Sequence, residues 1–172
     1  MTETRSEYLE ELYNKFKIQE QLHRWSRGAD RNDTDVMNSV FHPDANINYK
    51  YRTGTVGEFI PWVFEFHLTL VATAHILFNL LIRLDGENAY SEVGVDCRIR
   101  YEGESGLTDF SSLARYLDRW ERRNGVWKII DRVSVLDSYG TLPVQQAPEI
   151  AHWADLTLGS RSKDDPSYHY IF

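Results

Sequence analysis

Two short stretches contain the residue types that proton transfer requires. Trp25-Ser-Arg-Gly-Ala-Asp30 ends an amphipathic segment with an acidic side chain, and Thr73-Ala-His75 places a histidine at the start of an apolar segment. A neutral imidazole removes a proton near pH 7 because its ordinary pKa is about 6.5. A carboxylate bonded to the second ring nitrogen fixes the tautomer and stabilises the imidazolium that forms. Asp30 and His75 have the chemistry of a proton-transferring pair, and our central prediction is that they meet in one pocket.

The position of Asp30 favours a functional role. An acidic side chain at the C-terminus of a helix opposes the helix dipole, and this stretch ends the first predicted helix. Gly28 and Asp33 have structural explanations as helix stop and helix restart, whereas Asp30 has none as good. For His75 the alternative is a buried histidine that is hydrogen bonded for structural reasons only.

Arg132 is the predicted cationic member of the site. In a strand it shares one face with Ile130 and Ser134, so its charged head lies among apolar neighbours. A buried charge must be paired. Its partner is either a protein carboxylate or a substrate oxygen or leaving group, and the two readings are equally favoured.

Aromatic side chains that could form the walls of a pocket recur along the chain, although core packing is the alternative for each. Asn79 would share a strand face with His75 and offer a polar contact beside it. The predicted substrate-binding residues are Tyr49, Tyr51, Trp62, Phe66, Asn79 and Tyr116.

Other chemistries have little support. No HExxH or Cys-rich spacing occurs, so we expect no metal and no cofactor. No GxSxG occurs, and Cys97 lies within a predicted strand with no base adjacent in sequence. We expect His42 to be structural, and His23 and His67 to be satisfied by solvent or a helix end.

The N-terminal part of the chain is predicted to be helical. Thr4-Arg-Ser-Glu7 has the spacing of a capping box before an apolar segment of helical period, and Gly28 is predicted to end that helix in a left-handed conformation. Asp33-Thr34-Asp35 would restart a short helix. A third helix is expected from residue 56 to about 69, with a late start or a kink at Pro61.

The remainder of the chain is predicted to be a meander of long strands. Residues 46–51 form a short strand, and 74–84, 89–101, 110–123 and 126–139 are rich in β-branched and aromatic residues. Asp85-Gly86 and Asn124-Gly125 favour tight hairpin turns. Helices followed by strands indicate an α+β fold, in which the helices cover one face of a curved, mostly antiparallel sheet.

Length and composition indicate one domain that binds neither nucleic acid nor membrane. A chain of 172 residues can bury a sizeable core. A net charge of −7 disfavours a phosphate-binding surface, and no apolar run approaches the roughly 20 residues of a membrane span. The N-terminus is polar rather than signal-like, so we expect a cytoplasmic protein.

These motifs resemble the NTF2-like (SnoaL-like) superfamily over roughly residues 6–140. The resemblance rests on Gly-Ala-Asp30-Arg at the end of the first helix, on Phe-His42-Pro-Asp-Ala after it, and on the hairpin Trp120-Glu-Arg-Arg-Asn-Gly-Val-Trp-Lys128. Asp30, His75 and Arg132 match positions that the branch containing scytalone dehydratase and hexachlorocyclohexane dehydrochlorinase uses in its pocket. The resemblance therefore implies that Asp30 and His75 meet there. This sequence lacks the second histidine that the fungal dehydratase carries on the next strand.

The resemblance implies a cone of curved sheet closed by helices over a deep pocket, in residues 1–140. Residues 141–172 would form an extension that packs on the pocket or on a neighbouring subunit. The implied activity is a cofactor-independent lyase, or secondly an isomerase, acting on a hydrophobic cyclic or aromatic small molecule. The implied assembly is a homo-oligomer, either dimer or trimer. The alternatives are a non-catalytic binding or assembly domain of the same fold, and a structural protein like the β subunit of a ring-hydroxylating dioxygenase.

Overall fold

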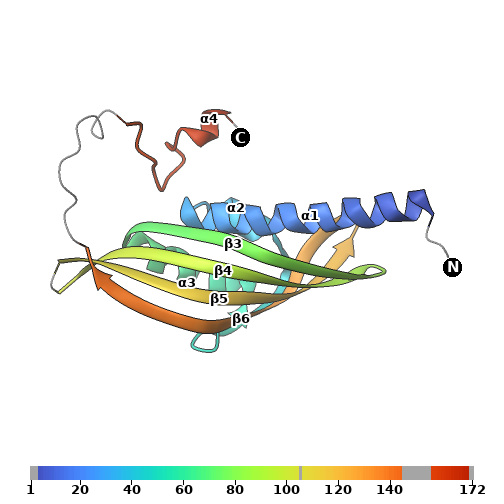
Figure 1. Ribbon diagram of the computed structural model, residues 1–172, viewed down its shortest axis with the longest axis horizontal. Helices are drawn as coiled ribbons and strands as arrows, with labels where there is room; N and C mark the ends of the chain where they lie inside the picture. The colour runs from blue at the N-terminus through green and yellow to red at the C-terminus, as the bar shows by residue number, and fades with distance from the viewer. Residues whose placement is uncertain (1–3, 105, 145–155, 171–172) are drawn as a thin grey trace.

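A computed structural model describes residues 4–104, 106–144 and 156–170, which form helices followed by a long-stranded sheet (Figure 1). In chain order the elements are α1 (Arg5–Asp30), α2 (Thr34–Ser39), β1 (Phe41–Asn48), β2 (Thr53–Thr55), α3 (Val56–Leu68), β3 (Leu70–Asp85), β4 (Asn88–Gly103), β5 (Gly106–Arg123), β6 (Val126–Pro143) and α4 (Ser167–Tyr170). Within these ranges, no helix is long and apolar enough to cross a membrane.

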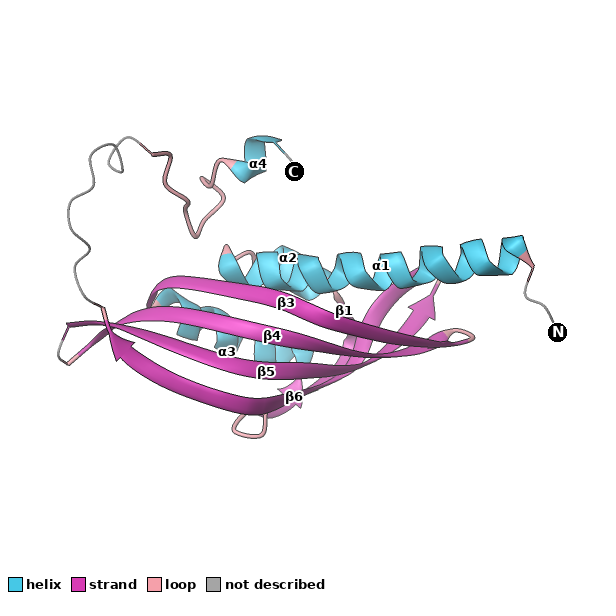
Figure 2. Cartoon of the chain, in the orientation of Figure 1, coloured by secondary structure: helices cyan, strands magenta, loops and turns pink. Residues whose placement is uncertain are grey.

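The sheet is curved and has the order β2-β1-β6-β5-β4-β3. Strands β3 to β6 form the predicted antiparallel meander, and β1 pairs with β6 in parallel, so the sheet is mixed. Figure 2 shows α1 lying along β3, with α3 on the concave side of the sheet. The predicted α+β class is confirmed.

The first helix begins as predicted and ends later than predicted. Thr4 and Glu7 form the capping box, with the Glu7 backbone N–H donating to Thr4 Oγ1. Gly28 does not end the helix: it is buried inside α1, and a Cβ there would lie 2.9 Å from Met37 Cγ. Close packing of α1 on α2 therefore explains this glycine. The left-handed residue is Asn32, with φ 53°, so Asp30 falls in the last helical turn.

Helix α3 begins at Val56, so the predicted late start at Pro61 is wrong. Thr55 and Glu58 form a second capping box, and Glu58 accepts hydrogen bonds from the backbone N–H and the hydroxyl of Thr55. These bonds stabilise the first turn, and Pro61 is tolerated inside the helix. His67 lies buried in the last turn, where α3 approaches the end of α1.

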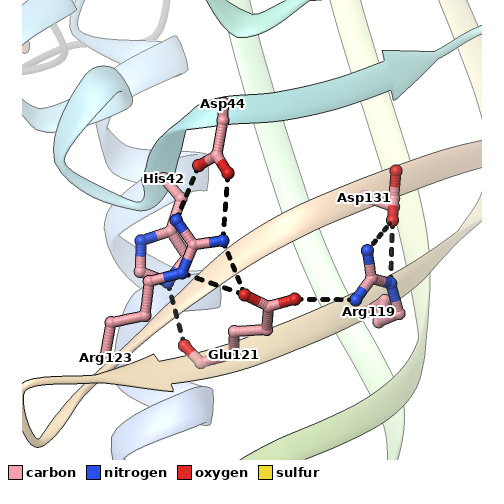
Figure 3. Close-up of polar contacts among 6 residues, drawn as sticks. All are labelled: His42, Asp44, Arg119, Glu121, Arg123 and Asp131. Atoms are coloured by element: carbon pink, nitrogen blue, oxygen red, sulfur yellow. Dashed lines mark hydrogen bonds and ion pairs between the residues drawn. The ribbon is translucent and has the colours of Figure 1, made fainter.

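A polar network fixes the start of β1 against the hairpin of β5 and β6 (Figure 3). His42 Nε2 donates to the backbone carbonyl of Glu121 at 3.0 Å, consistent with the structural role expected of it. Arg123 pairs with Asp44 and with the carboxylate of Glu121, which also accepts from Arg119. The predicted hairpin turn is present, with left-handed φ values at Asn124 and Gly125. The network holds β1 beside β6.

The described part of the C-terminal tail returns to the end of α1. Arg161 donates to the backbone carbonyls of His67 and Leu70, and Tyr168 Oη donates to Asp33. The tail therefore contacts the end of α3. The boundary at residue 140 stays a prediction, and residues 145–155, 171 and 172 of the predicted extension lie outside the described ranges.

Candidate active site

Asp30 and His75 lie in direct contact. His75 Nδ1 donates to Asp30 Oδ1 at 2.7 Å, and the backbone N–H of His75 donates to Asp30 Oδ2 at 3.1 Å. Thr73 Oγ1 also donates to Oδ1 at 3.1 Å. Because a carboxylate only accepts, Nδ1 carries the proton in neutral His75 and Nε2 is the basic nitrogen. The structure thus brings together the two residues predicted from sequence and fixes the tautomer that a base needs.

Burial and charge act in opposite directions on this histidine. Its side chain is 8% exposed and that of Asp30 is 17% exposed. Burial lowers the pKa of His75, but the Tyr116 phenol and the hydrogen-bonded Asp30 carboxylate outweigh burial and hold that pKa well above its usual value. His75 is therefore a stronger base than free imidazole, and it is protonated over a wider pH range.

His75 forms part of the wall of a cavity of about 680 Å³ between α1, α3 and the sheet. Asp30 does not line this cavity and lies behind the imidazole, next to a shallow surface depression. The wall is largely apolar and aromatic. Five predicted substrate-binding residues line it: Tyr49, Tyr51, Trp62, Phe66 and Tyr116.

Tyr49 presents a buried hydroxyl in this wall. Its Oη is buried and forms no hydrogen bond of good geometry with the described residues, although the Tyr116 phenol lies close enough to contribute to its raised pKa. Burial raises the pKa of Tyr49 well above 10, so the phenol stays neutral and can donate. A buried donor without a partner costs free energy, and a ligand oxygen in the cavity would remove that cost.

Arg132 does not line the cavity. Its guanidinium donates to both oxygens of Asp118 at 2.7 Å, and both side chains have an exposed fraction of 0%. Its Cζ lies 4.1 Å from the ring centroid of Tyr116, which does line the cavity. Of the two partners predicted for Arg132, the protein carboxylate matches these contacts, and a direct contact with substrate does not.

The predicted placement of Asn79 beside His75 is wrong. The pairing of β3 with β4 shifts register between Phe78 and Leu81, and Asn79 has a left-handed φ of 50°. This bulge turns the side chain out of the face that His75 and Leu77 share, and Asn79 is exposed. It lies away from the cavity wall.

Two residues at the site were not predicted to belong to it. Cys97 lines the cavity directly opposite His75 in the β3–β4 pairing, and its Sγ lies 3.5 Å from His75 Nε2. His67 also lines the cavity, 4% exposed, with its ring centroid 6.1 Å from that of His75. Its Nδ1 donates to the backbone carbonyl of Ala29 at 3.0 Å, and burial lowers the pKa of His67 to about 4. The cavity therefore has one histidine with a raised pKa and one with a lowered pKa.

No group of three or more His, Cys, Asp or Glu side chains in the described ranges is arranged to hold a metal ion.

The model of the SnoaL-like domain family matches residues 10–133 of the chain. An uncharacterized protein of Mycobacterium tuberculosis is 30% identical over 126 residues, which cover 72% of this chain and 85% of that protein.

Solved structures share the fold at lower identity. A type 2 hexachlorocyclohexane dehydrochlorinase (LinA) superposes with a TM-score of 0.72 at 21% identity, covering 81% of this chain and 97% of its own. A Novosphingobium aromaticivorans protein assigned as a scytalone dehydratase gives a TM-score of 0.69 at 21% identity, with coverage of 82% and 95%. An NTF2-like protein with a cystatin-like fold from the same organism gives 0.67 at 16% identity, with coverage of 80% and 92%.

Proposed function

This chain belongs to the SnoaL-like domain family of the NTF2-like superfamily, and from that premise we propose that it is a cofactor-independent lyase. His75 removes a proton from a hydrophobic cyclic or aromatic small molecule, and Asp30 orients His75 and stabilises the imidazolium that forms. Loss of water, a halide or a small carbonyl fragment from the carbanion or enolate then completes an elimination. Return of the proton to another carbon gives isomerisation, the second choice.

One observation carries the proposal: the 2.7 Å bond from His75 Nδ1 to Asp30 Oδ1, made at the wall of a large apolar cavity. The carboxylate lies behind the ring and the basic Nε2 lies on the opposite side of the ring. A general base placed in this way typically contributes about 10²–10⁴-fold to a rate. A histidine retained only for structure needs no cavity beside it.

The residues around the dyad stabilise the negative charge that develops when the proton is removed. Tyr49 donates its buried hydroxyl to the carbonyl or leaving-group oxygen that gains negative charge. Tyr116 forms the adjoining wall, backed by the Arg132 guanidinium 4.1 Å from its ring. Arg132 is therefore a positioning residue, whose buried charge acts through Tyr116.

The substrate class follows from the wall. Tyr51, Trp62 and Phe66 offer flat apolar surfaces, and the Trp62 and Phe66 rings stack with centroids 6.1 Å apart. Such walls suit a cyclic or aromatic body better than a flexible, charged one. Two proteins of the same fold are named after hexachlorocyclohexane and scytalone, so these compounds are reasonable first probes.

Two non-catalytic readings compete with this one. A binding or assembly domain of the same fold would hold small molecules without turnover. A structural protein like a dioxygenase β subunit would co-purify with an obligate larger partner. The dyad beside an open cavity favours the enzyme over both.

Proton abstraction can be tested without the natural substrate. A hydrophobic cyclic ketone with no leaving group, incubated with the protein in D₂O, should exchange its α-hydrogen for deuterium faster than in buffer, as followed by mass spectrometry. His75→Gln and Asp30→Asn should abolish most of the acceleration. Exchange that is equally fast in both folded variants would remove His75 as the base. Ligand binding without exchange would favour the binding-domain alternative.

We also propose that the protein forms a homo-oligomer through the face of the sheet opposite the cavity. Since Cys97 faces the cavity, Asp96 faces the other side, and its cross-strand neighbours Ile76 and Leu113 are each 47% exposed. Light scattering of the wild type and of Ile76→Glu tests this. A monomeric wild type would contradict the proposal.

A further inference from the structure

We propose that Cys97 is a reactive thiol that adds to α,β-unsaturated carbonyl compounds bound in the cavity. This goes beyond the proposed elimination, because it uses His75 as the partner of a nucleophile and not as a base towards carbon. It also gives the protein a reactivity that can be measured without knowing its substrate.

The thiol is the first of three side-chain groups in direct contact, followed by the His75 imidazole and the Asp30 carboxylate. Cys97 Sγ lies 3.5 Å from His75 Nε2, and His75 Nδ1 lies 2.7 Å from Asp30 Oδ1. Because Nδ1 carries the proton in neutral His75, the thiol donates to Nε2. Transfer of that proton gives a thiolate beside an imidazolium, and Asp30 stabilises the imidazolium. This is the arrangement that activates cysteine nucleophiles.

The position of Cys97 holds its thiol beside the His75 imidazole and leaves the sulfur accessible to a ligand in the cavity. Directly opposite residues of an antiparallel pair lie on the same face with their Cβ atoms about 5 Å apart, and His75 and Cys97 are such a pair. Cys97 is partly exposed and lines the cavity. The sulfur can therefore reach a molecule in the cavity without leaving the imidazole.

An independent observation points to a ligand at this end of the cavity. His67 is 4% exposed and lines the same wall, and its Nδ1 is committed to the carbonyl of Ala29. Its Nε2 is then an unprotonated acceptor, and no described residue donates to it. Burial keeps His67 neutral at physiological pH, with its pKa lowered to about 4. An acceptor of this kind fits a ligand with a hydroxyl or N–H donor.

The chemistry balances without a further reactant. The Cys97 thiolate forms a bond from sulfur to the β-carbon, and the π electrons of the C=C bond move to the carbonyl as an enolate. His75 Nε2–H then gives its proton to the α-carbon, which restores neutral imidazole. The sum is addition of S–H across C=C, and the reverse steps release the compound unchanged.

Cys97 is the only cysteine of the 172 residues, so the mass of one adduct reports on it alone. The probe is N-ethylmaleimide, which reacts by the same conjugate addition. Intact-mass spectrometry follows its rate of addition to the full chain at neutral pH. The same chain unfolded in urea gives the rate of an ordinary thiol.

At neutral pH the folded protein should react about tenfold faster than the unfolded chain, because His75 Nε2, 3.5 Å from the sulfur, can take the thiol proton as the C–S bond forms. His75→Gln should remove most of this acceleration. Asp30→Asn should lie between the two. A folded rate no greater than the unfolded rate overturns the proposal, and this comparison needs no variant to fold. Identical rates for wild type and folded His75→Gln overturn it as well.

A second pair of probes tests the role of His67. Cyclohexenone and a hydroxylated cyclohexenone should differ in their rate of addition to the wild type, in favour of the hydroxylated compound. His67→Asn retains a donor for the Ala29 carbonyl and removes the acceptor at Nε2, so the preference should disappear. A preference unchanged in His67→Asn would remove His67 from the ligand site. Because the maleimide assay does not depend on elimination, a failed search for lyase substrates leaves its result intact.

Discussion

His75 binds both oxygens of the Asp30 carboxylate, one with its ring and one with its main chain. The ring Nδ1 reaches Oδ1 at 2.7 Å and the backbone N–H reaches Oδ2 at 3.1 Å. The last turn of α1 is thereby tied to one position on β3. Rotation of either side chain would break one of these bonds, so the imidazole is held in a single orientation before any ligand enters. Such preorganisation is what a general base requires.

Removing the Arg132 side chain should destabilise the protein strongly. Arg132→Met leaves Asp118 as a buried charge without its partner, which typically costs about 3–5 kcal/mol. Asp118→Leu combined with Arg132→Met removes both charges and should recover most of that loss. Urea denaturation of the three proteins measures the difference. A single variant within about 1 kcal/mol of wild type would show that the pair is not structurally important.

His67 should make the protein sensitive to mild acid. Its pKa falls from an ordinary value of about 6.5 to about 4 on folding. The unfolded chain therefore binds the proton more tightly, and stability is lost as the pH falls from 6.5 towards 4. At about 1.4 kcal/mol per pKa unit, the loss is roughly 3 kcal/mol.

The matched variant is His67→Asn, which does not titrate and retains a donor for the Ala29 carbonyl. Its free energy of unfolding, measured by urea denaturation at steps across this window, should change less with pH than that of the wild type. Equal slopes for the two proteins would mean that His67 is not the group responsible.

Arg161 should be the main attachment of the C-terminal tail. It donates to the carbonyls of His67 and Leu70 at 2.8 and 2.7 Å and to Asn32 at 3.0 Å. Arg161→Ala removes all three bonds and should speed proteolytic cleavage of the tail. Lys163→Ala is the control, because its ion pair with Asp35 is exposed and contributes little. Equal cleavage rates in the two variants would contradict this assignment.

Residue types and turn chemistry were sufficient to predict the order of helices and strands. The capping box at Thr4 and Glu7 and the Asn124-Gly125 turn act locally, so they can be recognised without the fold. The pairing of Asp30 with His75 came from matched family positions. No local rule brings the end of a helix to one residue of a strand.

The errors and omissions arise from non-local contacts. Counted from the Asp85–Asn88 pair at the hairpin turn, the residue opposite His75 would be Arg98. The bulge near Asn79 shifts the register by one residue and places Cys97 there. The same bulge moves Asn79 away from the cavity. His67 was expected to be satisfied by solvent or a helix end, and its Nδ1 does donate to Ala29 in the last turn of α1. Its place in the cavity wall was missed because it depends on how α3 packs, which has no local sequence signal.

The central claim is that Asp30 and His75 act together as the base, and a pH–rate profile tests it most directly. With a turned-over substrate, wild-type kcat/KM should rise with pH through a pKa well above 6.5, because only neutral His75 accepts a proton and Asp30 favours the charged form. An NMR titration of the His75 ring should give a matching pKa. Asp30→Asn should lower that pKa and reduce the plateau rate by about 10²–10⁴-fold while the substrate still binds. A folded Asp30→Asn variant with the wild-type plateau and the wild-type pKa would contradict the account.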